Sequence, residues 1–180
     1  MKLNKYKYAI VINLYKLIEK NIRKSWQIID SKLGINFISS RSYSPHITLV
    51  SNLNFKKIII KKINSFLSNK IKPFNIYSNG LGVFFSDSPV VYLRWNINFE
   101  LLKLKNNLEK IFNTKQKNYS GLNWIPKSTI AYKNFDEKDL SKILLLIKKI
   151  NFKKKMEVKS ISVISYHEKY GEKKIYEFNF

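Results

Sequence analysis

The sequence has no cysteine and only two histidines, His46 and His167. The absence of cysteine excludes a disulfide framework, a thiolate metal site and a thiol nucleophile. Two histidines are too few for a His-rich metal centre, so we expect no bound metal ion. The five glycines form no Gly-rich phosphate-binding loop, and we expect no cofactor.

Long apolar runs are also missing: none approaches the roughly 20 residues that a membrane-spanning helix needs. The first residues, Met1 to Tyr6, lack the apolar core of a signal peptide. The hydrophobic fraction of 44% and the aromatic fraction of 14% are nevertheless typical of a folded chain with a buried core. We therefore expect a folded, cytoplasmic protein without a membrane partner.

Acidic residues are scarce as well, with 12 Asp and Glu against 34 Lys and Arg, which gives a net charge of +22. Such a charge attracts polyanions and favours RNA or a nucleotide as the partner. An alternative origin is an A+T-rich genome, because the chain has only two alanines and three arginines and its polar residues are mostly Lys and Asn. The charge acts on partners in the same way whatever its origin.

Hydrophobic periodicity predicts an α+β fold in which strands and helices alternate. The predicted strands cover residues 6–13, 45–50, 73–85, 89–95, 124–132, 157–166 and 174–180. The predicted helices cover residues 15–32, 55–67, 99–112 and 136–150. This order is a loose internal duplication of two α+β half-units, with a seam near residues 85–95. Because no linker rich in Gly, Ser or Pro separates the halves, we expect residues 1–180 to form a single domain with two lobes.

Two short segments share one pattern: Ser-Pro-His-Ile-Thr-Leu at residues 44–49 and Ile-Pro-Lys-Ser-Thr-Ile at residues 125–130. Each has a proline, a side chain that carries nitrogen, any residue, a threonine and an aliphatic residue. Two of the four prolines of the chain occur at these matching points. A single segment of this kind is a weak signal, but a pair on the strands of two half-units is a stronger one.

Strand alternation predicts which side chains of these segments share a face. His46 and Thr48 are expected to point one way, with the aliphatic residues of their strand in the core. Lys127, Thr129 and Ala131 are likewise expected on one face, with Ile130 and Tyr132 on the opposite face. Two such strands across a cleft would place two nitrogens and two hydroxyls around one phosphate.

The paired segments resemble those of the 2H phosphoesterase superfamily, which includes the RNA 2′,3′-cyclic phosphodiesterases also called 2′-5′ RNA ligases. The resemblance covers nearly the whole chain, from the aliphatic strand Tyr8–Leu14 to the closing segment Val158–Phe180. It implies a two-lobed fold with one such strand per lobe facing a central cleft. It also implies metal-independent cleavage of 2′,3′-cyclic phosphates, 2′-5′ linkages or cyclic nucleotides, in which two histidines act as general acid and base.

Carried over residue by residue, the resemblance makes His46 a catalytic residue and Thr48 and Thr129 the residues that hold the phosphate. Lys127 occupies the position of the second histidine and departs from the pattern. A histidine has an ordinary pKa of about 6.5, whereas a lysine begins at about 10.4, and a bound phosphate favours its charged form further. We therefore hypothesise that His46 is the acid–base group and that Lys127 is a phosphate anchor or a general acid.

Further side chains are candidates for the same site. Arg41 and Tyr43 precede the first segment and could contact a phosphate or stack on a base. His167 is expected at the surface, and the alternative is that it lines the cleft and replaces the missing histidine. Three more aromatic side chains are candidate stacking platforms, with core packing as the favoured alternative: Trp124, Phe84 and Phe85.

The sequence thus predicts a 2H-type phosphodiesterase that acts on a nucleotide phosphodiester. The main alternative is a catalytically degenerate protein of the same fold that binds RNA or a cyclic oligonucleotide without turnover. A third reading is a structural protein that coats RNA through its positive charge.

Overall fold

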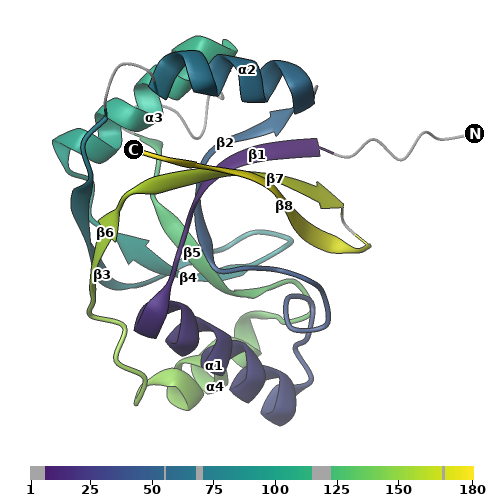
Figure 1. Cartoon of the computed structure of the whole chain (residues 1–180). Coiled ribbons are helices and arrows are strands. Elements are labelled where there is room, and N and C mark those ends of the chain that lie inside the picture. Colours follow the sequence, from purple (N-terminus) through teal and green to yellow (C-terminus); the bar gives the residue numbers. More distant parts are fainter. Residues whose placement is uncertain (1–6, 55, 68–70, 115–122, 168) are drawn as a thin grey trace, which may run out of the picture.

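The computed structural model describes residues 7–54, 56–67, 71–114, 123–167 and 169–180 (Figure 1). Within these residues, strands and helices alternate as the periodicity predicted. In chain order they are β1 (Lys7–Asn13), α1 (Lys16–Leu33), β2 (His46–Leu53), α2 (Lys56–Leu67), β3 (Phe74–Phe84), β4 (Val90–Trp95), α3 (Phe99–Phe112), β5 (Lys127–Tyr132), α4 (Glu137–Ile147), β6 (Lys155–Val158), β7 (Ser160–His167) and β8 (Gly171–Asn179).

The strands form two four-stranded antiparallel sheets, which confirms the predicted α+β class. The strand order is β2-β1-β7-β8 in one sheet and β5-β4-β3-β6 in the other. Figure 1 shows α2 and α3 at one end of the molecule and α1 and α4 at the opposite end. Helix α3 packs on β2, while α1 packs on both α4 and β5. The two strands that carry the paired segments therefore belong to different sheets.

The helices lie within one residue of their predicted bounds, except that α4 ends at Ile147 and not at residue 150. In α1 the buried residues recur at helical spacing: Ile18, Ile22, Trp26 and Ile29. Gly34 ends this helix in the left-handed conformation with φ of 67°, and its N–H donates to the Asp30 carbonyl at 2.8 Å. Asp136 caps α4, because its carboxylate accepts a hydrogen bond from the Lys138 N–H at 2.8 Å.

The single strand predicted for residues 157–166 is wrong, because this stretch contains two strands. β6 pairs with β3, whereas β7 pairs with β1 and β8 in the other sheet. Val158 and Ile161 on either side of the break are both buried in the same core. Alternating burial shows which face a side chain takes but not which strand the backbone pairs with. The apolar pattern therefore continues across the point where the chain passes from one sheet to the other.

Buried side chains from both sheets form one continuous hydrophobic core. It contains Ile10 and Val163 from one sheet together with Leu93 and Ile130 from the other. Trp95 is fully buried, and its indole N–H donates to the hydroxyl of the equally buried Ser128 at 3.0 Å. This hydrogen bond ties β4 to β5. No helix in the described part of the chain combines the length and apolar character that crossing a membrane requires.

Replacing Ser128 by Ala is expected to lower the free energy of unfolding by about 1–3 kcal/mol, because the Trp95 N–H is left buried without an acceptor. Chemical denaturation followed by tryptophan fluorescence measures the change. The matched control is Ser141→Ala on the exposed face of α4, which should change stability by less than about 0.5 kcal/mol. Equal effects of the two substitutions would contradict a stabilising role of this bond.

Candidate active site

Strands β2 and β5 pack directly against each other although they belong to different sheets. Both begin with the same contact. The Pro45 carbonyl accepts a hydrogen bond from the Leu14 N–H at 2.9 Å, and the Pro126 carbonyl accepts one from the Trp95 N–H at 2.9 Å. Proline lacks an N–H but keeps its carbonyl, so each residue joins the neighbouring strand only as an acceptor. The two segments are thus equivalent in backbone structure as well as in sequence.

Each of these strands also bulges directly after its threonine. The pairing of β2 with β1 skips Leu49, which follows Thr48, and the pairing of β5 with β4 skips Ile130, which follows Thr129. A bulge adds one residue to a strand, twists it more strongly and changes the direction of the side chains that follow. In both strands it comes immediately after the residues expected to hold a phosphate.

The bulge in β5 corrects the predicted position of Tyr132. Simple alternation placed Ala131 with Lys127 and placed Tyr132 on the opposite face. In the structure Ala131 is buried in the core, and Tyr132 lines the same cavity as Lys127. The extra residue of the bulge inverts the alternation, and nothing in the local sequence marks it.

A cavity of about 190 Å³ lies between β2 and β5 and brings the four motif residues together. His46 and Thr48 enter it from β2, and Lys127 and Thr129 enter it from β5. The alternating side chains Ile47 and Ser128 are fully buried. The remaining residues that line the cavity are Trp26, Ile38, Tyr43, Ser44, Pro45, Tyr132 and Glu172.

The His46 ring is fixed from one side. Its Nδ1 lies 2.8 Å from the Ser44 carbonyl oxygen and 3.5 Å from Oε2 of Glu172. Because a carbonyl only accepts hydrogen bonds, Nδ1 is the nitrogen that donates, and Nε2 is left for a ligand. Burial of the ring lowers the pKa of His46, but the charge and hydrogen bond of Glu172 and the Ser44 carbonyl outweigh burial. The pKa therefore lies above the ordinary histidine value, even though Lys127 opposes this rise.

Lys127 has no carboxylate partner within the part of the chain that the structure describes. Its Nζ lies 3.5 Å from the Thr129 hydroxyl and 6.0 Å from the centre of the Phe84 ring. Burial lowers the pKa of this ammonium group. A half-buried cation without a counter-charge is costly, and a bound anion would remove that cost.

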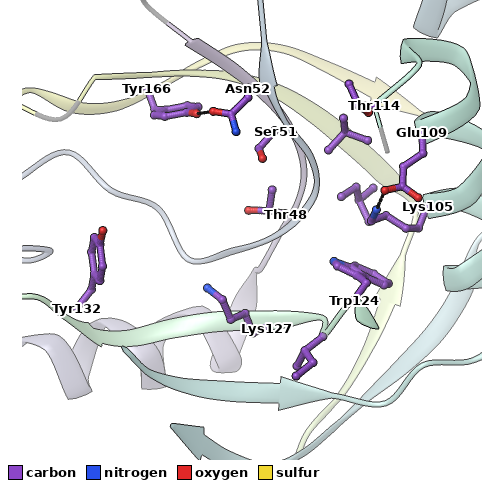
Figure 2. Close-up of a pocket in the computed structure, with 13 residues that line it drawn as sticks. Thr48, Ser51, Asn52, Lys105, Glu109, Thr114, Trp124, Lys127, Tyr132 and Tyr166 are labelled. Carbon is purple, nitrogen blue, oxygen red and sulfur yellow. Dashed lines mark hydrogen bonds and ion pairs between the residues drawn. The ribbon is translucent and has the colours of Figure 1, made fainter. Parts of the chain in front are cut away.

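A second cavity of about 470 Å³ adjoins the first and shares Thr48, Lys127 and Tyr132 with it (Figure 2). The Tyr166 hydroxyl donates to the Asn52 side-chain oxygen at 2.8 Å. In Figure 2 this hydrogen bond lies at the opposite end of the cavity from an ion pair of α3, and Thr48 and Lys127 lie between the two ends. The cavity leaves room for a group larger than a phosphate beside the paired segments.

That ion pair joins Lys105 and Glu109, which lie one turn apart in α3 and are almost fully buried. The Lys105 ammonium also lies 5.4 Å from the centre of the Trp124 ring. Burial lowers the pKa of Lys105, and the hydrogen bond and charge of Glu109 act against this effect. Thr114 lies nearby in the same cavity, and its buried hydroxyl has no hydrogen-bond partner among the described residues.

The other candidate residues divide into those that line a cavity and those that do not. Tyr43 lines the smaller cavity, and Trp124 lines the larger one. Arg41 lines neither: its guanidinium stacks 4.1 Å from the centre of the Phe37 ring and donates to the Phe37 carbonyl at 2.7 Å.

His167 lies at the end of β7 with its ring stacked on Tyr170 at 4.8 Å. It lines neither cavity, so it does not supply the missing second imidazole. Phe84 packs 4.5 Å from the centre of the Tyr92 ring, and Phe85 is 66% exposed. Neither phenylalanine lines either of the two cavities.

Sequence reasoning missed Glu172 and misplaced Tyr132. Glu172 lies more than a hundred residues from His46 in the chain, and only the packing of β8 against the loop before β2 brings them together. The one local signal is that Glu172 follows Gly171, because glycine often marks a turn or a close approach of two backbone segments.

The described residues contain no group of three or more His, Cys, Asp or Glu side chains that could hold a metal ion. The groups that face the smaller cavity are instead an imidazole, an ammonium, two threonine hydroxyls and one carboxylate behind the imidazole. This set offers hydrogen-bond donors and positive charge, which is the chemistry that binds an oxyanion.

No model of a known protein family matches the sequence, and no curated protein matches it. Solved structures do match over almost the entire chain. A Thermus thermophilus protein, TT0787, superposes with a TM-score of 0.63 at 11% identity, covering 96% of this chain and 97% of its own. E. coli LigT in complex with 3′-AMP superposes with a TM-score of 0.61 at 16% identity, covering 97% and 98%. The chain has a LigT-like 2H phosphoesterase fold.

Usb1 from Kluyveromyces marxianus shares this fold more distantly, with a TM-score of 0.50 at 11% identity over 97% of both chains. E. coli LigT has also been solved with phosphate, with a TM-score of 0.59 at 14% identity over 98% of both chains. At these identities the likeness concerns the fold alone and carries no information on the chemistry of the cavities.

Replacing Lys127 by Met is expected to weaken the binding of inorganic sulfate about 10- to 100-fold, because a hydrogen bond to a charged group contributes roughly 1.5–3 kcal/mol. Sulfate is a suitable probe since its charge is constant near neutral pH. Binding is measured by isothermal titration calorimetry at several pH values. It should weaken as the pH rises, because His46 and Lys127 each lose a proton in that direction.

The control is Lys148→Met at the exposed C-terminus of α4, which removes the same charge away from both cavities. This variant should retain most of the sulfate affinity. A similar loss in both variants would mean that sulfate senses only the net charge of the protein.

Replacing Glu109 by Leu alone is expected to destabilise the fold by about 3–5 kcal/mol, because Lys105 would remain buried without its partner. The double replacement K105M/E109L should recover most of that loss, since it removes both charges together. Thermal unfolding of the unchanged protein, the two single variants and the double variant measures this coupling. Additive losses would show that the two side chains do not depend on each other.

Proposed function

We propose that this chain is a metal-independent phosphodiesterase of the 2H type that acts on a nucleotide phosphodiester. The substrate classes are a 2′,3′-cyclic phosphate at an RNA end, a 2′-5′ linkage and a small cyclic nucleotide. The observation that carries the proposal is the cavity in which His46, Thr48, Lys127 and Thr129 meet from two equivalent strands. Its size and its donors suit one phosphate group.

In this proposal the phosphate lies between β2 and β5. The Thr48 and Thr129 hydroxyls donate hydrogen bonds to its oxygens, and Lys127 supplies a fixed positive charge against the charge that develops at phosphorus. A water oxygen attacks phosphorus and loses a proton to His46, the bond from phosphorus to the leaving ribose oxygen breaks, and that oxygen takes up a proton from His46 or Lys127. His46 exchanges the proton through Nε2, because Nδ1 is held by Ser44 and Glu172.

The adjoining cavity supports a nucleotide rather than a bare phosphate as the substrate. It shares Thr48, Lys127 and Tyr132 with the phosphate cavity, and about 470 Å³ is room for a nucleoside. E. coli LigT, whose fold is similar, has been solved with 3′-AMP and with phosphate. The net charge of +22 would attract an RNA end and make its binding fall steeply with salt.

The lysine at the position of the second histidine sets the expected rate. General acid–base steps contribute about 10²–10⁴-fold each, and a lysine matches neutral pH less well than a histidine does. We therefore propose a slow enzyme in which His46 performs the acid–base step and Lys127 acts as phosphate anchor or general acid. Lys127→His should accelerate the hydrolysis of a 2′,3′-cyclic phosphate by about 10²-fold.

The test incubates EDTA-treated protein with 2′,3′-cyclic mononucleotides, RNA ending in a cyclic phosphate, 2′-5′ oligoadenylate and a panel of cyclic dinucleotides. Chromatography resolves the products. Turnover of one class is expected, and His46→Ala should abolish it. His167→Gln, which changes the histidine outside both cavities, is the matched control and should retain activity.

Binding of one of these ligands without product, unchanged by His46→Ala, would instead support the non-catalytic alternative. The observation behind that alternative is that His46 lines the smaller cavity while His167 lines neither of the two cavities. If Lys127→His brings no gain in hydrolysis, the account of Lys127 given above is wrong.

A further inference from the structure

Among the residues that the structure describes, Glu172 is the one carboxylate that lines the phosphate cavity, and the family resemblance assigns it no role. Its side chain is 9% exposed, and that of His46 is 19% exposed, so their interaction is largely shielded from solvent. Shielding matters because an exposed pair of this kind contributes little. Oε2 of Glu172 lies 3.5 Å from Nδ1 of His46 and accepts a hydrogen bond from the Ser44 N–H at 3.3 Å.

The backbone brings this carboxylate to the ring through a close contact of two segments that are distant in the chain. Ser42 forms a parallel bridge with Gly171, and its carbonyl accepts a hydrogen bond from the Glu172 N–H at 3.2 Å. Gly171 has a φ of 82°, and a Cβ at this position would lie 2.8 Å from the Ser42 nitrogen. Only glycine meets both conditions without strain, so Gly171 is what allows β8 to start against the loop before β2.

We propose that Glu172 is a positioning residue of His46: together with the Ser44 carbonyl it holds Nδ1, and its charge stabilises the imidazolium, so that Nε2 is left to face the phosphate. The role assigned to Glu172 rests on the proposed function, because it concerns the acid–base group of that site. The contacts of Glu172 with His46 and Ser44 do not depend on which substrate is bound. Glu172 acts only through His46 and the Ser44 segment, so it is not itself a catalytic residue.

The titratable and charged groups around the His46 ring come from β8, β5 and the loop before β2. Glu172 of β8 and the Ser44 carbonyl favour the charged ring, and Lys127 of β5 disfavours it. Tyr43 before β2 and Tyr132 of β5 line the same cavity. Arg23 of α1 is directed to the Tyr43 carbonyl, at 3.4 Å, and also forms an ion pair with Glu19 in its own helix.

The balance of these groups favours the protonated ring, and Glu172 contributes the largest part of what opposes burial. Because the pKa of His46 is raised by folding, the pair contributes stability that is fully present below the ordinary histidine value of about 6.5. That contribution is lost as the pH rises through the raised value. Removing the carboxylate should therefore destabilise the protein most on the acidic side of this range.

The decisive experiment follows the His46 ring by ¹⁵N NMR and needs no substrate. His167→Gln provides a background with one histidine, because the chain has only two. In this background we expect the neutral ring to carry its proton on Nδ1 and to titrate above the ordinary histidine value. Adding Glu172→Gln should move the titration to lower pH, while the Ser44 carbonyl keeps the proton on Nδ1.

Glu177→Gln is the matched control, because Glu177 lies in the same strand and is paired with Lys174 and Ser160 instead. It should leave the titration of His46 in place. Gly171→Ala tests the placement: it keeps Glu172 but displaces the turn, so it should shift the titration in the same direction as Glu172→Gln. If Glu172→Gln does not fold, Glu172→Asp gives the same comparison with a shorter side chain.

The proposal is overturned if His46 titrates at the same pH with and without the Glu172 carboxylate, or if the neutral ring carries its proton on Nε2. Where turnover is detected, the limb of the kcat/KM–pH profile that His46 sets should move to lower pH in Glu172→Gln. A merely structural role of Glu172 would lower activity without moving that limb. If no substrate is turned over, the proposed function fails, and the NMR comparison still decides the role of Glu172.

Discussion

The contact between β2 and β5 is the constraint on which the cleft depends. Each strand belongs to its own sheet, so the distance between Thr48 and Thr129 is set by how the sheets pack and not by any one turn or loop. The sheets share a single core, in which Ile47 and Ile130 lie directly behind the cleft residues. Close packing of a core transmits displacement, so a change in volume behind either strand would alter the cavity between β2 and β5.

Much of the fold was readable from the sequence, because it depends on local signals. Helix α1 follows from the spacing of its apolar residues and from Gly34, and the start of α4 follows from Asp136. His46 and Lys127 were found through the repeated proline and threonine of their segments, which needs no knowledge of three-dimensional structure.

The failures have a common physical origin, since each depends on backbone pairing between distant parts of the chain. The bulge at Ile130 moved Tyr132 into the cleft, and the change of sheet at Lys159 divided one predicted strand into β6 and β7. Glu172 reaches the site only because β8 starts against Ser42. Side-chain periodicity carries no information on such pairings.

The charges in the cavity explain why a bound anion would stabilise the site relative to the empty state. Burial lowers the pKa of Lys127, and Lys127 in turn opposes the rise in the pKa of His46, so a negative charge in the cavity would favour the charged form of both groups. A bound phosphodiester stabilises both charged forms at once, and binding should therefore be accompanied by proton uptake. With phosphate present, Lys127 is driven toward its ammonium form, which anchors charge and donates protons but does not accept them. The base step, if the site performs one, then rests on His46 and on the carboxylate that holds its other nitrogen.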